Sequence, residues 1–284
     1  MGNLIPAESG WLYAIFSNPV MTPSGVLTMY LLIFARFVPV VSQCPFLGAK
    51  VAPAPIRIGF AFSLAAVILP FSIAGATKDV PFNASFVGLI SKEIIIGFVL
   101  GYLSSIPFYM VQSSGILIDF QRGSSSMMQQ DPTLQGQSSP LGILFNNILI
   151  VIFFQIGGAF YFMSAIFQSF EIVPPNGWIS AAFFSAKMPI WQEITGLMHQ
   201  IVAISIQLAA PSLVAILMAE AFLGIANRLA PQVQIAFLGM SLRSLLGLAL
   251  LFLGWAFILK QMGYVTLDWL KELLKQLINV NLSF

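Results

Sequence analysis

The chain has 284 residues, of which 58% are hydrophobic and only 8% are charged. Soluble domains contain about 25% charged residues, so the composition excludes an ordinary soluble fold and predicts an all-α, polytopic helical membrane protein. The net charge of +2, without a basic face, gives no sign of nucleic-acid binding. Cys44 is the single cysteine, which excludes an intramolecular disulfide.

Six apolar stretches approach the length of about 20 residues that a membrane-spanning helix needs. Several carry charges, among them Arg36 and the neighbours Lys92 and Glu93. Adjacent residues do not face each other on a helix, so we expect Lys92 and Glu93 to pair with other elements or to mark a polar kink. The six stretches are Val26–Val41, Ile56–Ala76, Phe86–Val111, Leu141–Phe170, Ile194–Ala226 and Val233–Leu259.

Prolines and glycines indicate where the apolar stretches are interrupted. We expect Pro39 and Pro45 to end the first helix, and residues 42–57 to form a non-helical connector. The adjacent glycines at 157 and 158 predict a kink or a close helix approach. Gly97 and Gly101 form a GxxxG pattern, which fits either a tight helix–helix face or ordinary packing elsewhere.

The last two apolar stretches are joined by a short turn that contains a proline, which predicts an antiparallel helical hairpin. Counted outward from the turn, Glu220 and Arg243 lie at similar depth, so we hypothesise a buried ion pair between them. Residues 261–284 carry leucines at helical spacing, which predicts an amphipathic tail helix. The hairpin turn consists of Asn227, Arg228, Ala230, Pro231 and Gln232.

A polar segment of about twenty residues, from Asp119 to Ser139, separates two long apolar blocks. Connections between helices usually need only a few residues, and longer ones are functional or disordered. The segment is rich in Ser, Gln and Gly, which favour mobility, and it carries Met127 and Met128, which offer adaptable apolar contacts. From composition alone it could be a plug, a lid or a solvated loop.

The sequence lacks the groups that an enzyme needs. There is no P-loop, no GxSxG elbow and no HExxH motif. His199 is the only histidine and has no carboxylate or cysteine cluster beside it, so we expect a structural role. No base accompanies the serines at 124–126. We therefore predict no enzyme activity, no catalytic residue, no cofactor and no metal site.

Two stretches resemble the SctT/FliR family of type III secretion export-gate proteins. The central stretch has a Gly, then Gln-x-Gly, then Asp-Pro, and the C-terminal stretch has a Gly followed by Asn-Arg-x-Ala-Pro-Gln. The resemblance covers nearly the whole chain in length and in the order of its apolar blocks. The matching residues are Gly115, Gln121, Gly123, Asp131, Pro132, Gly224, Asn227, Arg228, Ala230, Pro231 and Gln232.

The resemblance implies a non-enzymatic subunit of an export gate, integral to the bacterial inner membrane, with membrane lipid around the assembly. It implies assembly with SctR/FliP-like and SctS/FliQ-like subunits, which this chain would join as a single copy, and passage of unfolded exported proteins. It also implies a plug formed by Asp119, Phe120, Gln121, Arg122, Gly123, Ser124, Ser125, Ser126, Met127, Met128, Gln129, Gln130 and Asp131.

The resemblance further implies five parts of the chain. The first, 1–116, is SctR/FliP-like, 117–139 is the plug-like loop, and 140–193 is a long apolar helix with a connector. A SctS/FliQ-like hairpin at 194–260 and the tail at 261–284 complete the chain. Gly157-Gly158-Ala159 departs from many flagellar members, which carry one or two histidines after the glycine, and this difference favours a virulence-type system.

A secondary transporter for a small solute is the alternative that the sequence leaves open. The charges within the apolar stretches could line an ion or proton path, although no inverted repeat is visible. A transporter would purify as a monomer or a small homo-oligomer, whereas a gate subunit would travel in a large hetero-oligomer. The charges concerned are Arg36, Lys92, Glu93, Glu220 and Arg243.

Overall fold

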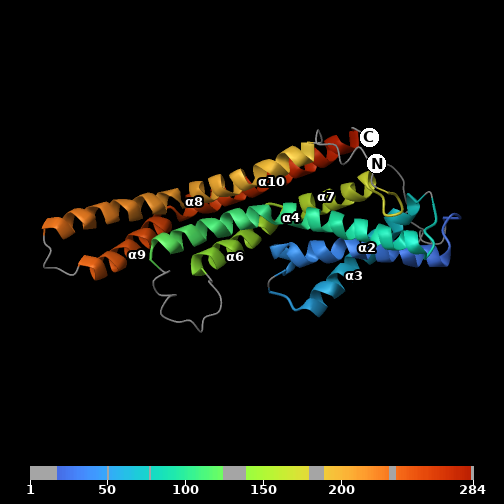
Figure 1. Ribbon diagram of the computed structural model, residues 1–284, viewed down its shortest axis with the longest axis horizontal. Coiled ribbons are helices and arrows are strands. Elements are labelled where there is room, and N and C mark those ends of the chain that lie inside the picture. Colours follow the sequence, from blue (N-terminus) through green and yellow to red (C-terminus); the bar gives the residue numbers. More distant parts are fainter. Residues whose placement is uncertain are drawn as a thin grey trace. The chain divides into compact units, whose positions relative to one another are not determined.

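The computed structural model describes residues 18–49, 51–76, 78–123, 139–178, 189–229 and 235–282 (Figure 1). Within these residues it contains eight α-helices, one short 3-10 helix and no strand, which confirms the predicted all-helical fold. Four helices are long and apolar enough to cross a membrane, and the number rises to six if two bent helix pairs each count as one span.

The helices divide between two compact units. The first unit consists of residues 1–105, 160–192 and 271–284, and the second of residues 106–159 and 193–270. Helix α4 contributes residues to both. The elements are α2 (Pro23–Gln43), η1 (Pro45–Leu47), α3 (Ala54–Ala74), α4 (Ala84–Gln121), α6 (Pro140–Gln155), α7 (Gly158–Ile172), α8 (Pro189–Leu229), α9 (Ile235–Leu253) and α10 (Trp255–Leu282).

Aromatic pairs hold α7 against its neighbours in the first unit. Its rings at 162, 167 and 170 meet Phe46 of η1, Phe71 of α3 and Phe37 of α2, with centroids 4.9, 5.6 and 6.1 Å apart. Tyr30 of α2 packs edge-on against Phe62 of α3 at 5.0 Å. Such pairs contribute about 0.5–1.5 kcal/mol each beyond the area that they bury, so α7 is part of this core although it lies far along the chain.

Helix α2 begins with a cap and continues past its proline. The Thr22 side chain accepts a hydrogen bond from the Gly25 amide at 3.0 Å. Pro39 lies inside the helix, which ends only at Gln43, so the prediction that Pro39 ends it is wrong. The connector is also not wholly irregular, because η1 and the first turn of α3 lie within it. Burial of the α2 face offsets the cost of a proline in a helix, about 3 kcal/mol.

The GxxxG pattern marks the contact between α2 and α4 in the first unit. A Cβ atom added at Gly97 would lie 2.1 Å from the Arg36 carbonyl oxygen, and one at Gly101 would lie 3.0 Å from Val40 Cα. Only glycine permits this approach, which confirms the tight helix–helix face.

In the second unit α6 packs between α4 and α10. The Phe108 and Phe153 rings are 5.6 Å apart, and those of Phe145 and Trp255 are 6.3 Å apart. Helix α8 joins α4 through Ser205, whose hydroxyl donates to the Met110 carbonyl at 2.9 Å. The end of α4 therefore has helical neighbours on more than one side.

Helix α4 runs ten residues beyond the predicted Val111, to Gln121. The extension is helical because it continues a buried stripe: Val111, Ser114 and Ile118 are all 0% exposed. As a consequence, Asp119, Phe120 and Gln121, which were predicted to open the loop, belong to the helix.

Two further boundaries bear on the prediction, one in agreement with it and one not. The fourth apolar stretch breaks between Gln155 and Gly158, where Gly157 has a φ of 74°, so the predicted interruption is confirmed. The sixth stretch breaks at Gly254 rather than ending near 260, and α10 continues unbroken into the predicted tail. A buried stripe explains this continuity, since residues 258, 262, 266 and 270 are all at most 3% exposed.

Candidate functional site

Three charged side chains of the first unit form one buried cluster, which we call the charge cluster: Arg36 of α2 with Lys92 and Glu93 of α4. Their exposed fractions are 1%, 5% and 0%. Arg36 Nη2 donates to Glu93 Oε1 at 2.9 Å and its Nε donates to Oε2, while Lys92 Nζ lies 2.7 Å from Oε1. Both residues pair with other elements as expected, Glu93 with Arg36 of α2 and Lys92 with the turn after α7. The expectation that they do not face each other is wrong, because the ammonium of Lys92 also reaches Glu93.

The Arg36 guanidinium also caps the end of α7. Its Nη1 donates to the Ser169 carbonyl at 2.8 Å and to the Ser169 hydroxyl at 3.1 Å, and its Nη2 donates to the Val173 carbonyl at 2.7 Å. The last carbonyls of a helix lack helical partners and carry partial negative charge. All five N–H groups of Arg36 are in use: they add a donor to the Ser169 carbonyl, which also accepts from the Val173 amide, and bind the Val173 carbonyl just after the helix. Its Cζ lies 4.0 Å from the centre of the Phe170 ring.

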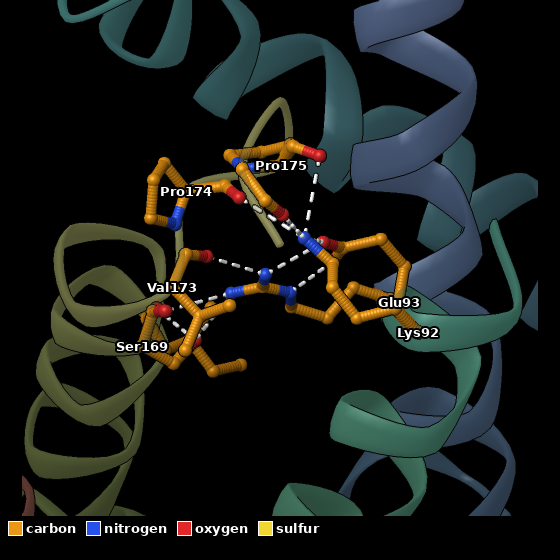
Figure 2. Close-up of polar contacts among 9 residues, drawn as sticks. Lys92, Glu93, Ser169, Val173, Pro174 and Pro175 are labelled. Atoms are coloured by element: carbon orange, nitrogen blue, oxygen red, sulfur yellow. Dashed lines mark hydrogen bonds and ion pairs between the residues drawn. The ribbon is translucent and has the colours of Figure 1, made fainter. Parts of the chain in front are cut away.

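Lys92 holds the turn that follows α7. Its ammonium donates to the carbonyls of Pro174, Pro175 and Gly177 at 3.0, 3.3 and 2.7 Å, and Figure 2 shows its side chain beside Glu93, with its ammonium pointing to this turn. Two cations and one carboxylate leave an excess positive charge, which the carbonyl oxygens offset. Protein acceptors bind the donors of both cations, so the cluster joins α2, α4 and the end of α7.

A second group of contacts, the Asp119 anchor, joins the end of α4 to the start of α6 in the second unit. Asp119 is 1% exposed. Its Oδ2 accepts hydrogen bonds from the Ser139 hydroxyl at 2.5 Å and the Leu141 amide at 2.9 Å, and its Oδ1 accepts from Arg122 Nη2 at 2.6 Å. One buried carboxylate thus holds both ends of residues 124–138.

The local sequence explains why α6 starts at this point. Ser139 is the N-cap, its hydroxyl oxygen accepts from the Gly142 amide at 2.9 Å, and Pro140 occupies the first helical position. The free amides of a helix N-terminus favour a nearby carboxylate. A serine cap contributes about 1 kcal/mol, whereas removing one partner of a buried charge costs about 3–5 kcal/mol, so Asp119 dominates the anchor.

Two glycines shape the same region. A Cβ atom at Gly115 would lie 2.6 Å from the Gly142 amide nitrogen, so α4 and α6 are in backbone contact next to the anchor. Gly123 adopts a φ of 95° directly after α4, a left-handed conformation that favours glycine. Phe120 is 66% exposed. The predicted plug residues Ser124 to Asp131 lie outside the described residues.

Arg243 and Glu220 form an ion pair between α9 and α8 in the second unit. Arg243 Nη1 lies 2.6 Å from Glu220 Oε1. The pair was expected to be buried, but the two side chains are 29% and 35% exposed. Of the predicted hairpin turn, Asn227 and Arg228 lie exposed in the last turn of α8. Ala230, Pro231 and Gln232 fall outside the part of the chain that the structure describes.

Two serines that hold these sites, Ser139 and Ser169, were not predicted from the sequence. Ser139 could have been found, because a serine before a proline is a typical helix start. Ser169 gave no signal, since it lies 133 residues from Arg36 along the chain.

His199 is exposed on α8. Cys44 is buried, and this burial raises the pKa of its thiol to about 12, which keeps the thiol neutral and unreactive.

The chain matches the family model described as "Bacterial export proteins, family 1" over residues 27–268. This chain belongs to that family. The match confirms the resemblance to the SctT/FliR export proteins, and it covers α3, α4 and α6 to α9 whole, most of α2 and half of α10.

The bacterial export protein is similar to proteins of secretion systems and to a flagellar protein. It is 33% identical over 239 residues to the Yop proteins translocation protein T of Yersinia pestis, with 84% of this chain and 87% of the relative covered. It is 29% identical to the secretion system apparatus protein SsaT of Salmonella typhimurium, covering 75% and 80%. It is 27% identical to the flagellar biosynthetic protein FliR of Bacillus subtilis, covering 75% and 81%.

These relatives and the apolar helices place the export protein in the bacterial inner membrane, as a subunit of a type III secretion or flagellar export apparatus. Its partners therefore include other apparatus subunits. Family membership replaces the transporter alternative.

Proposed function

We propose that the export protein is a non-enzymatic subunit of a type III export gate and that its central segment, residues 117–139, lies across the export path as a plug. The observation that carries this proposal is a polar segment whose two ends are held at one point. Asp119, in the last turn of α4, contacts both Arg122, directly after that helix, and Ser139, the N-cap of α6.

The composition of the segment suits a plug. Among residues 124–138 only Asp131 is charged, and the others are mainly Ser, Gln, Met and Gly. A plug has to be uncharged enough to occupy a narrow protein-lined path and polar enough to leave it. Met127 and Met128 would seal against varied surfaces because their side chains are flexible and apolar.

The proposed partners are SctR/FliP-like and SctS/FliQ-like subunits, with unfolded exported proteins as the substrate. Large apolar side chains of the second unit support such a surrounding, since Phe222 of α8 and Phe252 of α9 are 67% and 79% exposed. Within this proposal residues 1–116 are SctR/FliP-like and residues 194–260 are SctS/FliQ-like.

We further infer virulence-type rather than flagellar use. The identity is 33% to the Yersinia translocation protein and 27% to the flagellar protein of Bacillus subtilis. The break at Gly157-Gly158 lacks the histidine that many flagellar members of the family carry there. Two complementation experiments test this inference. The export protein should restore secretion of a virulence-type substrate in Yersinia that lack their own relative. It should not restore motility in a strain that lacks its flagellar relative.

The plug is tested by deleting residues 124–130, which leaves Asp119, Arg122 and Ser139 in place. The shortened chain is co-expressed with the neighbouring apparatus proteins, and entry of a small membrane-impermeant dye into cells is measured beside the mass of the purified complex. We expect a complex of unchanged mass and a membrane that has become permeable to the dye.

The matched control is a variant that keeps the full chain length and carries residues 124–130 in shuffled order. It should assemble and leak less than the shortened chain, because a polar segment still fills the path. A fully assembled complex with the shortened chain and a tight membrane would contradict the plug.

A further inference from the structure

The connection between α4 and α6 is closed at its base by a single buried carboxylate. Asp119 Oδ2 takes the hydrogen bonds of Ser139 and Leu141 from the α6 side, and Oδ1 takes that of Arg122 from the α4 side. We propose that Asp119 is a positioning residue that pins the start of α6 to the end of α4, and so sets the distance between the two helix ends that flank residues 124–138. Its effect on export rests on the proposed function, in which the plug includes residues 124–138.

Only a carboxylate satisfies all three donors at once. The Leu141 amide is among the amides that a helix N-terminus leaves without a helical partner, and the Ser139 hydroxyl donates to the same oxygen. An asparagine at 119 offers one acceptor oxygen, which can serve either the α6 side or Arg122. The change from Asp to Asn therefore opens one half of the anchor while keeping the size of the side chain.

The anchor differs from the nearby glycine contact in what it controls. Gly115 and Gly142 bring the two helices together but contribute no side-chain hydrogen bond. The anchor joins the last turn of α4 to the N-cap of α6, so it controls the spacing between these two helix ends.

The direct test measures the distance between the two helix ends. Spin labels on cysteines introduced at Phe120 and Ile143, which are 66% and 46% exposed, report this distance in the complex purified with its apparatus partners. Cys44 is buried and stays unlabelled. With the anchor intact we expect one narrow distance distribution, and with Asp119→Asn a broader one shifted to longer distances.

Asp268→Asn is the matched control, because it removes the same charge from an exposed position on α10 of the second unit. It should leave the distribution unchanged. If Asp119→Asn also leaves it unchanged, Asp119 does not pin the two helices and the proposal is overturned.

Ser139 keeps the proposal testable if Asp119→Asn does not assemble. Ser139→Ala removes the hydroxyl that donates to Asp119, and Ser139→Thr retains a hydroxyl at the same position. We expect Ser139→Ala to broaden the distance distribution and Ser139→Thr to restore it. An equal effect of both substitutions would contradict the anchor.

Dye entry separates the anchor from the plug. Asp119→Asn should raise dye entry in the full-length chain and add nothing in the chain that lacks residues 124–130. If the distances change but the shortened chain is tight, the plug is wrong and the anchor stands. If Asp119→Asn raises dye entry equally in both chains, it acts through the helix bundle and its role in positioning the segment is overturned.

Discussion

Two arginine–glutamate pairs in this export protein have the same chemistry and different surroundings. In the first unit Arg36 and Glu93 are almost fully buried, and Lys92 and the end of α7 complete their hydrogen bonds. In the second unit Arg243 and Glu220 share one contact and are about one-third exposed. The difference shows that the partners around an ion pair, more than the pair itself, decide what the pair contributes.

The buried cluster joins elements that are distant in sequence, whereas the exposed pair joins neighbours in a hairpin. Glu93 lies 57 residues and Ser169 133 residues from Arg36, against 23 between the members of the second pair. The first therefore determines the tertiary structure of its unit, because without it α7 loses its cap and the following turn loses its anchor. The second is available to a covering partner subunit.

Glu93→Gln should have the largest effect. It leaves two cations buried without a carboxylate, and we expect it to lower the free energy of unfolding by about 3–5 kcal/mol. Thermal unfolding of the purified complex measures this loss. The double variant Arg36→Gln/Glu93→Gln should lose less than the sum of the single changes. If Glu93→Gln lowered the free energy of unfolding by less than about 1 kcal/mol, as expected for an exposed pair, the charge cluster and the Glu220–Arg243 pair would not differ in their contribution to stability.

Gly97→Ala tests the helix approach that makes the cluster possible. The added Cβ would lie 2.1 Å from the Arg36 carbonyl, so α2 and α4 must separate, and we expect a loss of about 1–3 kcal/mol in the same unfolding measurement. Gly59→Ala in α3 is the matched control, because its Cβ would meet nothing within 4 Å. It should be neutral or stabilising by up to about 1 kcal/mol. Equal effects at the two glycines would refute the close contact.

Lys92→Met should be milder than Glu93→Gln, because it removes the excess positive charge together with the donor. It leaves the carbonyls of Pro174, Pro175 and Gly177 without their ammonium, for which we expect a loss of about 1–3 kcal/mol. Lys271→Met, at an exposed position of α10, is the control and should change stability by less than about 0.5 kcal/mol. A Lys92 variant as stable as this control would show that the turn does not need the lysine.

The Glu220–Arg243 pair should give the smallest effect. A double-mutant cycle with Glu220→Gln and Arg243→Gln in the isolated chain should return a coupling of about 0.2–1 kcal/mol. In the assembled complex the coupling should be larger, because a covering subunit would exclude water from the pair. The same small coupling in both states would show that no partner covers this face.

The sequence predicted what depends on local pattern. Apolar stretches located the helices, the paired glycines located the break at Gly157, and counting outward from a short turn brought Glu220 and Arg243 together. It did not predict the partners of Arg36, since nothing in the chain near Arg36 indicates contact with Ser169. Boundaries failed where packing overrode composition, as at Pro39 and at the end of α4, where Asp119 is helical although its sequence is polar.

The proposed gate is tested most directly by the mass and subunit content of the complex that purifies with this chain in mild detergent after co-expression with its neighbouring genes. We expect a single copy held with several copies of two other small membrane proteins, which would cover the exposed apolar side chains and the Glu220–Arg243 pair. A stable monomer or homodimer would contradict it.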